Sequence, residues 1–179
     1  MGCGNALAKT SHCYVVDETT LLTGTTAYSQ YDCFGSEISI TDATLEANGV
    51  GTIETIEFIE YSDDSSNALV KPDLSVYISK ITMNGTDDSA FNPADLSVVS
   101  DYLGKVTTIS NSSDYTVHDA PNSPNFVMAS AIKTVDYTFI NSTNTSLYIQ
   151  LVLPSATNLP NPGASGRSYV LRTTIRRHG

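Results

Sequence analysis

Hydrophobic and polar residues alternate along most of this chain of 179 residues, with the two-residue period of half-buried β-strands. The alternation is clearest in residues 52–81, where two runs rich in β-branched and aromatic residues flank a polar turn at 62–67. The second run has one apolar and one polar face, with Leu74, Val76 and Ile78 on the first and Ser75, Tyr77 and Ser79 on the second. This stretch predicts two strands of a β core.

The same pattern predicts further strands on both sides of this stretch. Tyr28 and Phe34 are predicted to anchor the rim of the core, and Gly35 suits the tight bend that follows them. The run 146–153 is the most apolar, so we expect it to be a central strand. In the last strand, 168–177, we expect four residues to face inward and three outward: Tyr169, Leu171, Thr173 and Ile175, then Arg172, Thr174 and Arg176.

Other segments interrupt the strands. Asn92 as an N-cap, Pro93 at the first helical position and Gly104 as a stop predict one short helix near residues 93–102. Residues 111–125 and 154–166 are polar and contain prolines, so they are predicted to be long surface loops. The Asn-Gly sequence at 48–49 predicts a hairpin turn into the strand at 52.

Eight or nine predicted strands with one short helix indicate an all-β fold, either a β-sandwich or a jelly roll. The length favours one domain. Residues 1–12 have no strand pattern and one charged residue, Lys9, so we expect a flexible N-terminal arm there. Residues 13–179 are then a single β-sandwich domain.

Charge is distributed unevenly along the chain, whose formal net charge is −10. Every acidic residue lies at or before Asp136, whereas residues 137–179 contain four arginines. A net acidic chain is a poor general binder of nucleic acid, so we expect no nucleic-acid partner.

The basic C-terminal end allows two interpretations. In the first, Arg172 and Arg176, together with Lys9 of the arm, are contacts for an acidic partner surface. In the second, the two arginines pair with glutamates on an adjacent strand of the same molecule, namely Glu54, Glu57 or Glu60.

The three cysteines, Cys3, Cys13 and Cys33, fit no zinc-binding spacing. Their odd number argues against a disulfide scaffold and suits assembly in a reducing cytoplasm, so we expect reduced thiols without a crosslink. No positively charged segment followed by an apolar run opens the chain, and no apolar run is long enough to cross a membrane. We therefore predict neither a secretory signal nor a membrane partner.

No group of residues has the spacing of a catalytic or metal site. His12, His118 and His178 lie in the arm, in a loop and at the C-terminus, and nothing in their spacing makes them converge. The aspartate pairs at 63–64 and 87–88 lack the spacing of a calcium loop and are interpreted as turn residues. We expect no catalytic residues, no metal and no cofactor, and a protein that is not an enzyme.

Sugar binding is also disfavoured by the composition. The chain has no tryptophan, and its ten tyrosines are scattered along the sequence. Carbohydrate sites usually rely on broad aromatic platforms, which scattered tyrosines do not provide by themselves.

A series of landmarks over residues 27–177 resembles the capsid cement, or decoration, proteins of tailed bacteriophages. The landmarks are glycines, an Asp-Ala-Phe turn and a strand with a Tyr and a Gln. In chain order they are Tyr28-x-x-x-Asp32-x-x-Gly35, Gly49-x-Gly51-x-Ile53-x-x-Ile56, Leu74-x-Val76-Tyr77-Ile78, Asp87-Asp88-x-Ala90-Phe91, Leu103-Gly104-x-Val106 and Leu147-Tyr148-Ile149-Gln150-Leu151-Val152.

This resemblance implies a β-sandwich that sits on the outer surface of a phage head and clamps neighbouring major capsid subunits. The partners implied are the major capsid protein and the protein itself, as a homotrimer ahead of a homodimer, with assembly in the host cytoplasm. A function of another class stays open: an adhesion or receptor-binding module of a head fibre or tail tip that binds host glycans. A third alternative is a secreted enzyme or inhibitor domain.

Overall fold

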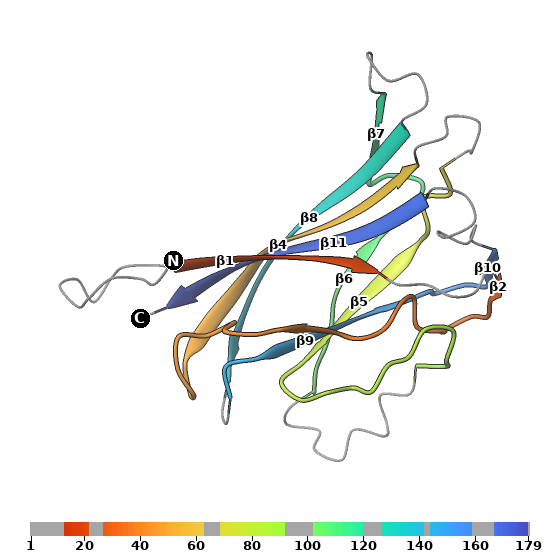
Figure 1. Ribbon diagram of the computed structural model, residues 1–179. Helices are drawn as coiled ribbons and strands as arrows, with labels where there is room; N and C mark the ends of the chain where they lie inside the picture. The colour runs from red at the N-terminus through yellow and green to blue at the C-terminus, as the bar shows by residue number, and fades with distance from the viewer. Residues whose placement is uncertain are drawn as a thin grey trace.

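Two antiparallel sheets packed face to face form the described part of the molecule (Figure 1). The computed structural model describes residues 13–21, 27–62, 69–91, 102–119, 127–141, 144–158 and 167–178. These residues contain eleven strands and no helix. The prediction of an all-β fold with a β-sandwich architecture is therefore confirmed.

The larger sheet has five strands. Its strand order is β1-β11-β4-β8-β7. The bounds are β1 Cys13–Leu21, β4 Val50–Ser62, β7 Tyr115–Asp119, β8 Val127–Ile140 and β11 Arg167–His178. The pairing register shifts between Ile53 and Thr55 in β4 and between Thr174 and Ile175 in β11. Irregularities of this kind bend a sheet and increase its local twist.

The smaller sheet has four strands in the order β3-β9-β5-β6. Its strands are β3 Ile38–Ile40, β5 Leu74–Ser79, β6 Tyr102–Ile109 and β9 Leu147–Val152. Two short strands, β2 Ala27–Tyr28 and β10 Thr157–Asn158, pair separately. Because β9 is paired on both sides, the prediction that the run 146–153 is central is confirmed.

The hydrophobic core lies between the two sheets. Phe34, Phe58 and Tyr169 are fully buried there, and the rings of Phe34 and Tyr169 meet edge to face with their centroids 5.1 Å apart. Burying one such side chain stabilises the fold by about 1.5–3 kcal/mol. Tyr28 is also buried, and Gly35 takes a φ of 74°, so the predicted anchors and the bend are confirmed.

Several local expectations were wrong. Tyr102, the last residue of the predicted helix, and Gly104, its predicted stop, lie in β6; residues 93–101 lie outside the described residues. The segment expected to be one loop from 111 contains β7, and the Asn-Gly turn does not close a hairpin because β3 and β4 lie in different sheets.

In the described part of the chain no helix is long and apolar enough to cross a membrane.

The expectation of wholly reduced cysteines was also wrong. Cys13, at the start of β1, is disulfide-bonded, and its partner lies outside the described residues. Cys33 is a free, buried thiol. An odd number of cysteines leaves at least one thiol unpaired but does not prevent two others from meeting in the fold, and for that reason the counting argument failed.

Candidate functional site

The outward-facing side chains of the five-stranded sheet form one continuous surface, which we call the outer face. In one row across it, Ile132 of β8 lies opposite Glu57 of β4, and Arg172 of β11 lies between Glu57 and Glu18 of β1. Opposite residues of paired strands point to the same side of a sheet. The outer face comprises Tyr14, Val16, Glu18, Thr55, Glu57, Ile132, Arg172, Thr174 and Arg176.

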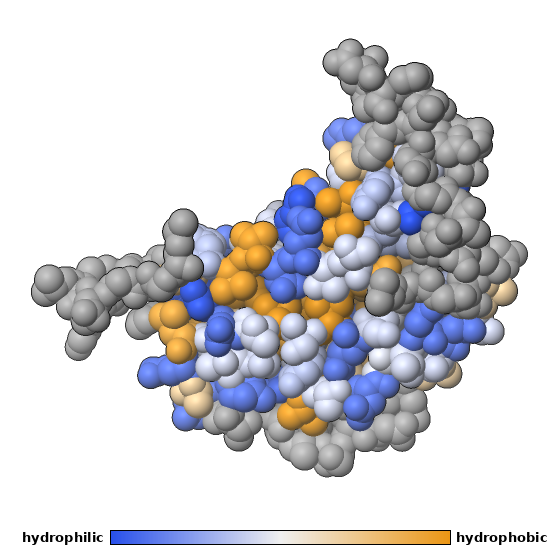
Figure 2. All heavy atoms as spheres, viewed as in Figure 1, coloured by the Kyte–Doolittle hydropathy of each residue, from blue (hydrophilic) through white to orange (hydrophobic). Residues whose placement is uncertain are grey.

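Large apolar side chains of the outer face are open to solvent. Tyr14, Val16 and Ile132 keep 56%, 61% and 60% of their surface exposed. Figure 2 shows orange apolar side chains lying between blue hydrophilic ones on this side of the molecule. Single exposed apolar residues are common, but several on one sheet face favour an interaction surface.

The predicted outward direction of Arg172 and Arg176 is confirmed, and both form ion pairs within the molecule. Arg172 Nη1 lies 2.6 Å from Glu57 Oε2, and Arg172 Nη2 lies 2.8 Å from Glu18 Oε2. The neighbouring glutamate carboxylates raise the pKa of Arg172, with the hydrogen bond to Glu18 as the largest contribution.

Arg176 makes a looser contact. Its Nε lies 3.1 Å from Glu54 Oε1 but without the alignment of a hydrogen bond. The intramolecular interpretation thus holds for the charges themselves, although both arginine side chains stay partly exposed, at 39% and 30%. Lys9, the other candidate contact, lies outside the described residues.

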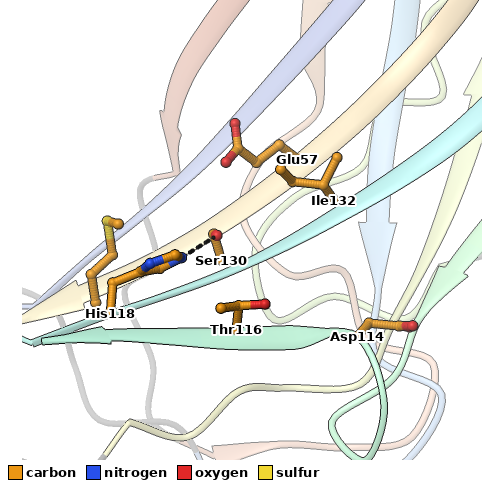
Figure 3. Close-up of a pocket in the computed structure, with 7 residues that line it drawn as sticks. Glu57, Asp114, Thr116, His118, Ser130 and Ile132 are labelled. Atoms are coloured by element: carbon orange, nitrogen blue, oxygen red, sulfur yellow. Dashed lines mark hydrogen bonds between the residues drawn. The ribbon is translucent and has the colours of Figure 1, made fainter.

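A shallow hollow of about 410 Å³ lies beside this row (Figure 3). It is bounded by β4, β7 and β8, and its lining mixes carboxylates, hydroxyls, an imidazole and two apolar side chains. The lining residues are Glu57, Asp114, Thr116, His118, Met128, Ser130 and Ile132. A volume of this size falls within the range of small-ligand sites, about 300–1,000 Å³.

The hollow contains a serine–histidine contact that resembles part of a hydrolase triad. His118 Nε2 lies 3.1 Å from Ser130 Oγ. A triad also needs an acid to orient the imidazole. Asp114, four residues before His118, is about 13 Å away along the strand axis at 3.3 Å per residue, and Figure 3 shows it at the other end of the hollow. Asp114 instead binds Lys133 Nζ at 2.6 Å.

The two histidines among the described residues lie apart. His118 of β7 lies opposite Met128 of β8, level with the end of β4. His178 of β11 lies opposite Val50, at the start of β4. His12 lies outside the described residues. Among the described residues, no group of three or more His, Cys, Asp or Glu side chains is placed to hold a metal ion.

A buried ion pair fixes the end of the outer-face strands. Arg167 Nη1, at the start of β11, lies 2.8 Å from Glu60 Oε1, and the two side chains are 3% and 0% exposed. Glu60 also accepts hydrogen bonds from the backbone N–H groups of Val70 and Lys71. Glu60 therefore joins β11 to the segment that leads into β5.

Sequence reasoning missed the apolar members of the outer face and the hollow. Val16 and Ile132 look like ordinary core residues in the sequence, because their exposure depends on which sheet face the other layer covers.

Comparison with models of known protein families finds no match, and comparison with curated proteins finds none either.

Proposed function

We propose that this protein is a capsid cement protein on the outer surface of a tailed-phage head, where it clamps neighbouring major capsid subunits. The observation that supports the proposal most is the outer face, where exposed Tyr14 and Val16 of β1 and exposed Ile132 of β8 lie on either side of the ion pairs of Arg172. A partner covering these side chains would gain about 25 cal/mol for each Å² of apolar surface removed from water.

The paired arginines suit this role as polar contacts at the same surface. A guanidinium has five N–H donors, and Arg172 uses three of them on Glu18 and Glu57. The remaining two can donate to carboxylates of a shell. Because Glu18 and Glu57 already hold the Arg172 side chain in place, that side chain loses less rotamer freedom when a partner binds it.

A cement protein acts through interface area rather than chemistry. We propose a homo-oligomer, trimer ahead of dimer, that is not an enzyme and has no nucleic-acid or membrane partner. The disulfide at Cys13 supports a location on the virion surface, where disulfides persist, after assembly in the host cytoplasm.

The hollow supports a second candidate function, an adhesion module of a head fibre or tail tip. Its hydroxyl, imidazole and carboxylate groups around Ile132 and Met128 have the mixed character of a small-ligand site. In this case the outer face binds a receptor group instead of a capsid subunit.

Cosedimentation with phage heads stripped of the protein tests the cement role. Wild-type protein should pellet with the heads and saturate. Val16→Asp with Ile132→Asp should abolish pelleting, whereas Leu45→Asp, at a 41%-exposed leucine outside the outer face, should not. Absence of saturable wild-type binding, or normal binding by the double variant, would overturn the proposal. If wild-type protein binds a host receptor but does not bind heads, the adhesion module is favoured.

A further inference from the structure

Three aromatic residues that are distant in the sequence gather on the other side of the sandwich. Tyr77 projects from β5 away from the core, because its neighbours Val76 and Ile78 are core residues. Its ring lies 4.8 Å, centroid to centroid, from the ring of Phe91. The backbone N–H of Phe91 donates to the carbonyl oxygen of Tyr31 at 2.9 Å, which brings the third aromatic residue beside the pair.

Tyr31 is held open to solvent in a strained conformation. It has a φ of 70°, in the left-handed region that glycine adopts most easily, and its side chain is 57% exposed. The surrounding turn is well fixed, since the Ser29 N–H donates to Asp32 Oδ2 and Gln30 Nε2 donates to the carbonyl oxygen of Pro154. Strained residues of this kind concentrate at binding sites.

Polar groups border the aromatic side chains. Lys105 of β6 lies opposite Tyr77, is exposed, and forms no ion pair with another described residue. Burial, and then the nearby Tyr31 phenol, raise the pKa of Tyr77. The tyrosine rings offer an apolar surface on which a ligand can pack. Their hydroxyls and the Lys105 ammonium can orient that ligand through hydrogen bonds.

We propose that Tyr31, Tyr77 and Phe91 form a carbohydrate-binding platform. One face of a pyranose ring presents C–H groups that pack on an aromatic ring, while its hydroxyls bond to phenol oxygens and to the Lys105 ammonium. A polyanionic nucleic acid is a poor alternative for a chain of net charge −10. The fold supplies the platform that the scattered tyrosines do not provide in the sequence.

This platform is separate from the outer face. It lies on the outer side of the four-stranded sheet, whereas the outer face belongs to the five-stranded sheet. A molecule that attaches to a surface through the outer face therefore presents the platform to solution. Saccharide binding can fail while head binding succeeds, and the reverse, so the two proposals are tested independently.

Saturation-transfer NMR with the full chain tests the platform, using chitotriose, maltotriose and trigalacturonate as probes. Each probe is added up to about 10 mM, where even a millimolar site is mostly occupied. At least one probe should bind wild-type protein. Tyr31→Gly should weaken that binding about tenfold or more. Glycine adopts the observed positive φ without strain, so this variant should remain folded.

Leu45→Ala is the control, because Leu45 is exposed but belongs to neither the platform nor the outer face. Its saccharide binding should equal that of the wild type. If no probe binds the wild type, or if Tyr31→Gly binds as well as Leu45→Ala does, the platform assignment is wrong. Circular dichroism of both variants confirms that they are folded.

Discussion

Glu60 and Arg167 form an ion pair that is almost completely buried, with Glu60 Oε1 and Arg167 Nη1 2.8 Å apart. Removing one member leaves the other charged and without its partner in the interior, which costs about 3–5 kcal/mol. We therefore expect Arg167→Ala to lower the free energy of unfolding by about that amount. Urea denaturation followed by circular dichroism measures it.

Arg172→Ala serves as the comparison, because its ion pairs are partly exposed and such pairs contribute about 0–1 kcal/mol each. If Arg167→Ala and Arg172→Ala prove equally stable, the buried pair does not have the role assigned to it. The double variant Glu60→Gln with Arg167→Met should recover part of the loss, since no charge then remains buried.

The outer-face arginines should matter more for binding than for folding. We expect Arg172→Ala with Arg176→Ala to lower the free energy of unfolding by about 2 kcal/mol or less. In contrast, affinity for phage heads should fall, and the difference from wild type should shrink as salt is added. A double variant that melts several degrees lower yet decorates heads normally would show that these arginines act within the molecule alone.

The thiol content should reflect the disulfide at Cys13. With three cysteines in the chain, a partner within the same chain leaves one thiol, that of Cys33. Alkylation in denaturant should therefore add one label before reduction and three after it. In the native protein Cys33 should react slowly, because burial and then Asp32 raise the pKa of this thiol to about 11. Three labels without reductant would contradict the disulfide.

Asp114 should make part of the stability dependent on pH. Its hydrogen bond from Lys133, followed by that from the Ser110 N–H, lowers the pKa of its carboxyl below 3.8 in the folded protein. The unfolded chain then binds this proton first as the pH falls, so the contribution is present above pH 3.8 and is lost as the pH drops through the folded pKa.

Asp114→Asn removes that titration. We expect the unfolding free energy of this variant to fall less steeply than that of the wild type below about pH 4. Acid titration of urea midpoints compares the two proteins. Parallel curves would mean that the Asp114–Lys133 contact does not couple stability to protonation.

The alternation of apolar and polar residues correctly predicted which side chains of a single strand point into the core and which point outward. In β11, Tyr169, Leu171 and Ile175 are buried as the period of two requires, and Arg172 points outward. The assignment of β4 and β5 to different sheets does not follow from their sequences, because pairing partners are chosen by contacts between distant segments.

Other features were hidden because local composition misleads. β7 has few apolar residues, Tyr115 and Val117 among them, so the segment resembles a polar loop until it pairs with β8. Arg167 looks like an ordinary surface charge, and its burial depends on Glu60, which is 107 residues away in the chain. The aromatic platform likewise exists only after folding brings Tyr31, Tyr77 and Phe91 together.

We propose that the outer face is the surface that binds the phage head. Hydroxyl-radical footprinting of free and head-bound protein tests it directly, because exposed side chains lose reactivity when a partner covers them. We expect Tyr14 and Ile132 to become protected on head binding, while Leu45 and Tyr31 react as in the free protein. Unchanged reactivity at Tyr14 and Ile132 in protein that is bound to heads would contradict the claim.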